Sequence, residues 1–110
     1  MKIFEKPWGH EIIIENNKQY LFKKLYMKKN ARCSLQFHKF KVETIYVLSG
    51  LLEIQINNKF HKLGKGESLT IKNKVNHRMK ALKNNTFYIE SSSPHPNDVV
   101  RLEDDYKRST

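Results

Sequence analysis

Short β-strands separated by turns dominate this chain of 110 residues and limit the folds that it can adopt. The segments expected to form strands are rich in β-branched and aromatic residues. They span residues 10–15, 19–27, 32–38, 43–48, 51–56, 67–71, 77–82 and 86–91. With asparagine and glycine turn signals between them and no sustained helical period, strands at spacings of roughly ten residues predict an antiparallel sandwich or barrel. The C-terminal stretch 97–110 fits either a short helix or a last extended segment.

The length and composition of the chain fit one domain with a substantial hydrophobic core. Hydrophobic residues make up 38% and charged residues 29% of the sequence, a balance typical of globular rather than disordered proteins. No apolar run approaches the roughly 20 residues needed to span a bilayer, and the first residues lack the apolar core of a signal peptide. Cys33 is the only cysteine, so no internal disulfide can form. We therefore expect a cytoplasmic protein, without a membrane partner, in which Cys33 is a small buried side chain.

The formal net charge of +10 raises the question of nucleic-acid binding, since basic surfaces attract polyanions. The composition argues against it, because the chain has 17 lysines but only four arginines. Arginine is the residue suited to bidentate contacts with phosphates and bases. We predict no nucleic-acid partner, but a solvated basic surface with a few lysines facing a small anionic ligand.

Three polar residues occupy positions where a buried strand would normally carry apolar side chains. Gln36 and His38 are two residues apart and share one face of a strand, whereas Glu43 begins the apolar run ETIYVL. The odd offset between His38 and Glu43 requires a turn or bulge at 39–42 to bring the three side chains together. An unpaired, buried Glu43 would be costly. Either a bound cation or an ion pair with a lysine would remove that cost.

The spacing of these residues resembles the first motif of the cupin family, which are small double-stranded β-helix barrels. That motif runs from Gly through five residues to His-x-His, then through four residues to Glu and six to Gly. Asn30, Gln36, His38, Glu43 and Gly50 hold these positions. Asn30 replaces the opening Gly, and asparagine tolerates a positive φ better than most residues.

The second cupin motif, Gly, five residues, Pro-x-Gly, two residues and His, resembles the stretch from Gly66 to His77. His77 is in register with the motif. Lys72 and Lys74 stand where the motif has Pro and Gly, so the turn before His77 departs from the family's pattern.

Gln36 in place of the first motif histidine resembles the cupin domain of type II mannose-6-phosphate isomerases, usually fused behind a mannose-1-phosphate guanylyltransferase. It also resembles a group of stand-alone bacterial cupins named after that enzyme. The stand-alone group opens with Lys-Pro-Trp-Gly-His-Glu, here 6–11, and closes with a stretch like 91–108, in which Lys107 replaces a usual Gly. The resemblance implies an all-β fold, one cupin double-stranded β-helix (jelly-roll barrel) domain over residues 1–110.

The resemblance also implies a metal site formed by Gln36, His38, Glu43 and His77. Two imidazoles, one carboxylate and one amide oxygen suit one divalent transition ion and leave room for water or substrate oxygens. The ligands do not identify the ion: zinc, manganese, iron, cobalt and nickel are all compatible, and an oxygen-activating iron site also uses two histidines and one carboxylate. The remaining histidines have no companion ligands and are expected at the surface or in turns.

The related enzymes act on a phosphorylated sugar, so cations are expected where the phosphate binds. Lys23 falls where the relatives carry lysine, and Arg101 falls on the arginine of the closing motif, although either could be an ordinary surface charge. Trp8 could stack on a sugar or nucleoside, or anchor the N-terminal segment in the core. The general base is not apparent from the sequence, and Glu90 and Tyr26 are the candidates.

The function implied by the resemblance is a metal-dependent sugar-phosphate isomerase of the mannose-6-phosphate/fructose-6-phosphate type, in carbohydrate or surface-polysaccharide metabolism. The alternative is a non-catalytic cupin that binds a sugar phosphate or nucleotide-sugar as a sensor or partner subunit. A sugar epimerase would require a His-Asp or Tyr acid/base pair, which the sequence does not reveal. Because cupins commonly pair through exposed sheet edges, we also expect a homodimer.

Overall fold

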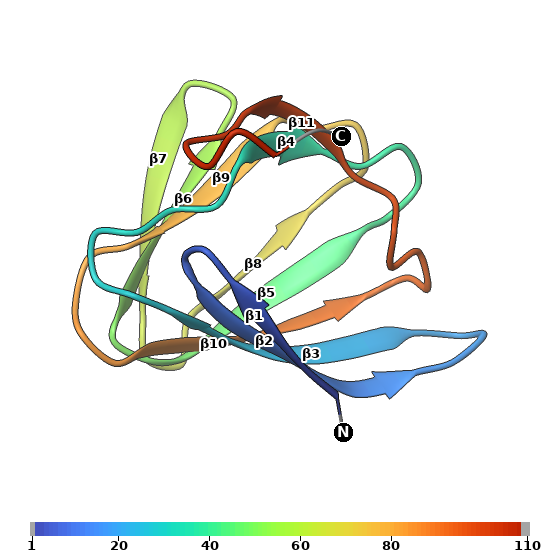
Figure 1. Cartoon of the computed structure of the whole chain (residues 1–110), viewed down its shortest axis with the longest axis horizontal. Helices are drawn as coiled ribbons and strands as arrows, with labels where there is room; N and C mark the ends of the chain where they lie inside the picture. Colours follow the sequence, from blue (N-terminus) through green and yellow to red (C-terminus); the bar gives the residue numbers. More distant parts are fainter. Residues whose placement is uncertain (1, 109–110) are drawn as a thin grey trace.

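The computed structural model describes residues 2–108 and consists of two antiparallel β-sheets that face each other (Figure 1). The larger sheet contains, in spatial order, β1 (Lys2–Lys6), β2 (Gly9–Asn16), β3 (Leu21–Met27), β10 (Thr86–Ser92), β5 (Glu43–Ser49) and β8 (Ser68–Ile71). The smaller sheet contains β11 (Val100–Glu103), β4 (Leu35–Phe37), β9 (His77–Ala81), β6 (Leu51–Ile56) and β7 (Lys59–Gly64). The predicted all-β fold is confirmed. Among the residues described, no helix has the length and apolarity needed to span a membrane.

The strands that the sequence analysis did not identify all lie at sheet edges. Each predicted strand has a counterpart, although 32–38 shortens to β4. The two missed strands, β1 and β7, are mostly exposed. The undecided stretch 97–110 contains the strand β11, and its last two residues lie outside the described part of the chain. All three end the order of strands in their sheet. Edge strands bury little and therefore lack the alternation that marks a strand in a sequence. The homodimer expected through such an edge stays a prediction.

The core lies between the sheets, where alternate residues of each strand point inward. In β3 the inward row is Leu21, Lys23, Leu25 and Met27, all buried. Other strands of the same sheet contribute Ile45, Val47, Ile71 and Tyr88, and the facing sheet contributes Leu52, Ile54, Leu63, Met79 and Ala81. Lys23 interrupts an otherwise apolar row, which marks the place where the core gives way to a polar interior.

The Pro-Trp-Gly segment attaches the N-terminal hairpin to this core. Trp8 is only 6% exposed and belongs to the core cluster, which agrees with an anchor for the N-terminal segment; it also lines a cavity between the two sheets, so the alternative of stacking on a sugar stays a prediction. Gly9 lies so close to β3 that a Cβ atom would be 2.0 Å from the carbonyl oxygen of Tyr26. The close approach of the two backbones therefore requires glycine at this position.

The backbone keeps a glycine-like conformation at three positions where this chain lacks an expected glycine, two in the cupin motifs and one in the closing stretch of the stand-alone group. Asn30, Lys74 and Lys107 have φ angles of 67°, 66° and 57°. Asparagine adopts such angles readily, whereas for lysine the Cβ atom crowds the following carbonyl. The turn before His77 is therefore preserved in shape, with strain at Lys74.

We expect Lys74→Gly to stabilise the protein. Removing the Cβ atom relieves roughly 1–2 kcal/mol of left-handed strain, and the greater freedom of glycine in the unfolded chain offsets about half of the gain. The measurement is the melting temperature, which we expect to rise by a few degrees. Lys72→Gly is the matched control, because Lys72 is exposed and has no positive φ, and it should lower stability. Equal effects of the two changes would contradict the strain at Lys74.

Candidate metal and substrate site

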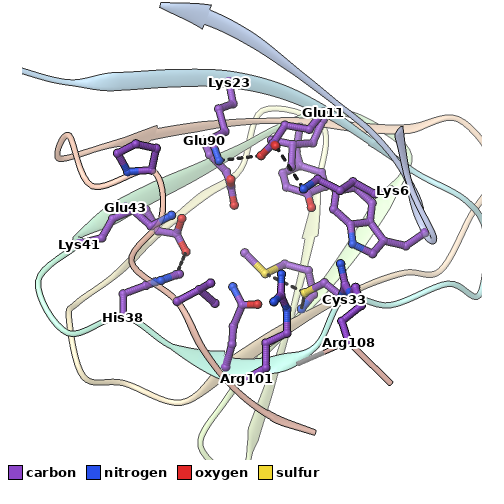
Figure 2. Close-up of a pocket in the computed structure, with 17 residues that line it drawn as sticks. Lys6, Glu11, Lys23, Cys33, His38, Lys41, Glu43, Glu90, Arg101 and Arg108 are labelled. Carbon is purple, nitrogen blue, oxygen red and sulfur yellow. Dashed lines mark hydrogen bonds and ion pairs between the residues drawn. The ribbon is translucent and has the colours of Figure 1, made fainter. Parts of the chain in front are cut away.

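A cavity of about 130 Å³ lies between the two sheets and has an unusually polar lining. Figure 2 shows Lys23, Glu11 and Glu90 on one wall, with His38, Arg101 and Arg108 on the opposite wall. The ionisable residues that line it are Lys6, Glu11, Lys23, Cys33, His38, Lys41, Glu43, Tyr88, Glu90, Arg101 and Arg108. So many charges in a domain of this size indicate a site that binds a polar ligand.

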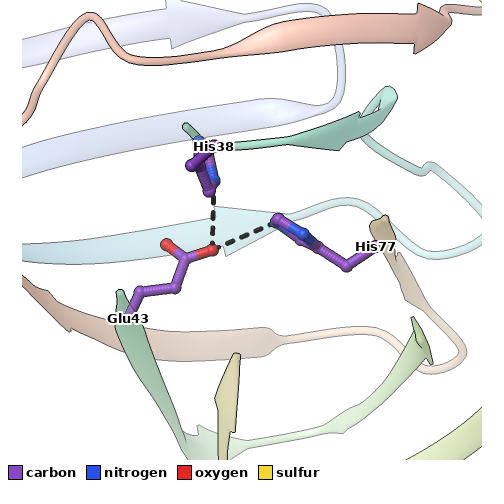
Figure 3. A group of neighbouring side chains, drawn as sticks. All are labelled: His38, Glu43 and His77. Atoms are coloured by element: carbon purple, nitrogen blue, oxygen red, sulfur yellow. Dashed lines mark ion pairs between the residues drawn. The ribbon is translucent and has the colours of Figure 1, made fainter. Parts of the chain in front are cut away.

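Three predicted metal ligands, His38, Glu43 and His77, converge next to this cavity, and the first two also line it (Figure 3). The Nε2 atoms of His77 and His38 lie 3.1 Å and 3.4 Å from Oε1 of Glu43. Candidate ligand atoms of the three residues lie within 4.8 Å of one another. Two ligands that each lie about 2.1 Å from one ion in tetrahedral geometry are roughly 3.4 Å apart. The spacing in the structure therefore matches a shared ion.

The ligand atoms are buried and, within residues 2–108, have no hydrogen-bond partner. This holds for Nε2 of His38, Nε2 of His77 and Oε1 of Glu43. No lysine ammonium of the described chain lies within 4.0 Å of Glu43; its ionic neighbours are the two imidazoles. Buried polar atoms without partners are rare because each one is costly. A cation between them would satisfy all three atoms, so these residues fit the predicted divalent ion.

Backbone carbonyls fix the orientation of both imidazoles. Nδ1 of His77 lies 2.9 Å from the carbonyl oxygen of Val75, and Nδ1 of His38 contacts the carbonyl oxygen of Asp98. An imidazole that donates from Nδ1 keeps its lone pair on Nε2. Both rings therefore present a metal-binding nitrogen to Glu43.

Asp98 also holds the turn that brings His38 and Glu43 together. Its carboxylate accepts the backbone N–H groups of residues 39, 40 and 41 at 3.0, 2.8 and 3.0 Å. Burial opposes the charge, but these three bonds outweigh it and lower the pKa of Asp98 to about 2. The predicted turn at 39–42 is confirmed, and its stability rests on a residue that the sequence analysis did not identify.

The protonation of Glu43 results from opposing effects. Burial disfavours its charge, whereas the nearby imidazoles of His38 and His77 and the positive charge of Lys41 favour it. Together they hold the pKa of the Glu43 carboxyl well below its usual range. Glu43 is therefore a carboxylate at neutral pH, as a metal ligand must be.

Gln36 lies beside the three ligands but differs from them in its contacts. It pairs with His77 across β4 and β9 and lines the cavity. Its Oε1 accepts a hydrogen bond of 2.6 Å from the hydroxyl of Ser34. Its role as a fourth, neutral ligand stays a prediction.

Lys23 lines the cavity as expected, but its ammonium is engaged. It is 8% exposed, and Nζ lies 2.6 Å from Oε1 of Glu11, whose other oxygen lies 3.7 Å from Nζ of Lys6. Burial opposes the charge of Lys23, but Glu90 and Glu11 outweigh it and raise its pKa. A bound phosphate would compete with Glu11 for Lys23, so its predicted role remains untested.

Two arginines of the C-terminal segment line the cavity. Arg101 lies on β11 opposite Gln36, as a ligand-binding residue would. Arg108, which the sequence analysis missed, reaches the cavity with its guanidinium held 2.8 Å from Asp104. Cys33 also lines the cavity, where burial raises the pKa of its thiol to about 11. The thiol is therefore neutral at physiological pH, although the side chain is only partly buried, and not fully as predicted, because it faces the cavity.

Comparisons with known proteins give the chain its relatives. Residues 1–104 match the family model described as mannose-6-phosphate isomerase C-terminal. The xanthan biosynthesis protein XanB of Xanthomonas campestris pv. campestris (strain B100) is 31% identical over 108 residues, which cover 94% of this chain and 23% of that protein. The mannose-1-phosphate guanylyltransferase ManC of Salmonella typhimurium (strain LT2) is 29% identical over 107 residues, 94% of this chain and 22% of that protein. The chain thus spans less than a quarter of the length of these curated relatives.

Solved structures identify the fold. An RmlC-like cupin from Shewanella frigidimarina NCIMB 400 matches with a TM-score of 0.77 and 19% identity, over 87% of this chain and 86% of that chain. The predicted cupin double-stranded β-helix is therefore confirmed.

We expect Glu43→Gln to lower the affinity for a divalent transition ion at least tenfold. The change keeps the size of the side chain and one oxygen, but it removes the single negative charge among the candidate ligands and raises the charge of the loaded site from +1 to +2. A tenfold loss reduces the stabilisation by bound metal by about 1.4 kcal/mol. The measurement is the rise in melting temperature on adding the metal, compared between wild type and variant. Glu53→Gln on β6, outside the cavity, is the control, and an equal rise in all three proteins would refute the metal site.

We expect Asp98→Ala to weaken metal binding about tenfold, the lower end of the usual effect of changing an outer-shell partner of a histidine ligand, because the partner carbonyl is displaced but not removed. Without the carboxylate, the turn at 39–41 loses three hydrogen bonds, so the backbone carbonyl of residue 98 that contacts Nδ1 of His38 is no longer fixed against this turn. The measurements are metal affinity and the ¹⁵N chemical shifts of His38, which report the tautomer. Asp104→Ala is the control, because Asp104 also accepts backbone N–H groups but none next to a metal ligand. A loss of stability without a change in affinity or tautomer would show that Asp98 supports the fold alone.

Proposed function

The chain belongs to the family of mannose-6-phosphate isomerase C-terminal domains, and we propose that it isomerises a phosphorylated sugar in this cavity, with one divalent transition ion held by Gln36, His38, Glu43 and His77. The pair mannose-6-phosphate and fructose-6-phosphate is the first to test, because the family's description names that isomerase. The single observation that carries the proposal is that buried metal-ligand atoms without hydrogen-bond partners lie next to a cavity that several cationic side chains line.

The names of the relatives support a place in sugar metabolism. XanB is named for xanthan biosynthesis and ManC for the transfer of a guanylyl group to mannose-1-phosphate. Since the chain corresponds to less than a quarter of either protein, only the part of their function that resides in this domain is relevant. We infer a phosphorylated sugar of the hexose class.

Different residues of the chain would bind the two ends of the ligand, the sugar oxygens that react and the phosphate. When bound, the ion would supply Lewis acidity toward the carbonyl and hydroxyl oxygens of the sugar. Lys6, Arg101 and Arg108 line the same cavity and would hold the phosphate through charge-assisted hydrogen bonds. Glu11, paired with Lys6 and Lys23, would set the positions of these ammonium groups.

The experiment is a coupled isomerase assay with metal-reconstituted protein over a panel of hexose, pentose and amino-sugar phosphates. Turnover of one substrate, abolished by chelation and by His77→Ala, is the expected result. Saturable binding without turnover would favour the non-catalytic sensor or partner subunit. Elemental analysis that finds no bound zinc, manganese, iron, cobalt or nickel after reconstitution would overturn the metal-dependent mechanism.

We expect Arg101→Ala to weaken binding of mannose-6-phosphate roughly 10- to 100-fold and to leave binding of mannose nearly unchanged. A charge-assisted hydrogen bond contributes about 1.5–3 kcal/mol, which corresponds to losses of this size. Calorimetric titration of both ligands into the metal-loaded protein measures the difference. Lys59→Ala, at the exposed start of β7, is the control for the loss of one positive charge. Equal losses for the two ligands would mean that Arg101 has a structural role.

A further inference from the structure

Glu90 is a cavity carboxylate that the metal site does not use. It lies on β10, opposite Lys23 of β3 on one side and Ile45 of β5 on the other. Residues that face each other in this way share one face of the sheet, and Lys23 and Ile45 are both buried between the two sheets. Figure 2 shows the Glu90 side chain pointing into the cavity from this wall.

The strand register brings Glu90 close to the metal ligands. Glu43 pairs with Ser92, two residues along β10 from Glu90. Glu90 and Glu43 are therefore diagonal neighbours on the same sheet face, a relation that separates side chains by about 7–8 Å. A small molecule in the cavity beside the three metal ligands would contact Glu90 as well.

Glu90 differs from the other cavity carboxylates in having no competing contact. Glu11 is paired with Lys23 and Lys6, and Glu43 faces the two imidazoles. Within the described part of the chain, Glu90 makes no hydrogen bond and no ion pair closer than 4.0 Å. Its carboxyl group is therefore available to a ligand.

Tyr26, the other candidate for the general base, lies away from the cavity. Its ring packs against those of His10 and Phe87, with centroid distances of 5.3 Å and 5.0 Å. Tyr26 pairs with Phe87 on the sheet face opposite to that of Lys23 and Glu90. It does not line the cavity.

From this placement we propose that Glu90 is the catalytic acid/base of the isomerisation and carries the proton between C2 and C1 of the sugar; the inference rests on the proposed function. The carboxylate takes the proton from C2 of the open-chain aldose. The C–H electron pair forms the C1–C2 double bond, and the π pair of the C1 carbonyl moves to O1. The O2 hydroxyl proton moves to O1, the ketone forms at C2, and the protonated Glu90 returns its proton to C1. No oxidant or reductant is required.

The surroundings of Glu90 suit both halves of this transfer. Burial, followed by the charge of Glu43, raises the pKa of Glu90 to about 7, with a smaller contribution from Glu11. Lys23 and Lys41 oppose the shift. A group that is present both as a base and as an acid near neutral pH can accept the proton and return it.

The test compares wild type, Glu90→Gln and Glu90→Asp, each loaded with metal and supplied with mannose-6-phosphate in D₂O. Turnover, deuterium incorporation at C1 and C2, metal content and Kd for the sugar are measured for each. We expect Glu90→Gln to lose turnover and deuterium incorporation at least 100-fold, with metal content unchanged and Kd within a few-fold of wild type. Glu90→Asp, which keeps the carboxylate, should recover part of the activity. Glu53→Gln, outside the cavity, should match wild type in every measurement.

The outcomes separate the inference from the function on which it rests. Turnover by Glu90→Gln within tenfold of wild type would overturn the role of Glu90 and leave the isomerase intact. Loss of metal or sugar binding in proportion to the loss of turnover would show a binding role and overturn the inference as well. Binding of the sugar by wild type, without turnover or deuterium incorporation, would overturn the proposed function and the inference together.

Discussion

Compensation of charge between the two sheets is the constraint on which the rest of this structure depends. Burial disfavours a charge there, so an inward-facing ion is costly unless a partner compensates it. Glu11 forms ion pairs with Lys23 and Lys6. Glu43 faces the imidazoles of His38 and His77, whose Nδ1 atoms contact backbone carbonyl oxygens. The pairs leave the ligand atoms of the His38–Glu43–His77 cluster unsatisfied. The buried charges of Glu11 and Lys23 thus compensate each other, whereas the ligand atoms of this cluster are left for the ion that is expected to bind there.

The sequence predicted the parts of this arrangement that depend on regular spacing. Strand alternation placed Gln36 and His38 on one face, and the offset to Glu43 required the turn that the structure contains. The family pattern added His77. The same alternation could have distinguished Glu90 from Tyr26, the two candidate bases, because Glu90 lies two positions from the buried Tyr88 in a strand of the core.

The remaining features could not be predicted because they join segments far apart in the chain. Asp98 reaches the turn at 39–41 across about 60 residues, and nothing in its local sequence indicates that contact. The pairing of Lys23 with Glu11 depends on the register of β2 and β3, and Arg108 enters the cavity from the end of the chain. The edge strands β1 and β7 were not predicted because both are mostly exposed and therefore lack the alternating apolar pattern of a strand. The register between strands far apart in the chain, and the presence of exposed edge strands, therefore could not be predicted from a single sequence.

The position of β10 between β3 and β5 has a consequence for how the protein is made. A ribosome would deliver β3 and β5 long before the strand that joins them, and β11 and Asp98 later still. Neither sheet can close on a partial chain, so the nascent polypeptide exposes unpaired strand edges until almost all of it has emerged. Such non-local pairing also slows folding, because the entropy of closing long loops is lost before the stabilising contacts between distant strands can form. The turn that Asp98 holds, and with it the placement of His38 beside Glu43, therefore forms only after the chain has been made as far as residue 98.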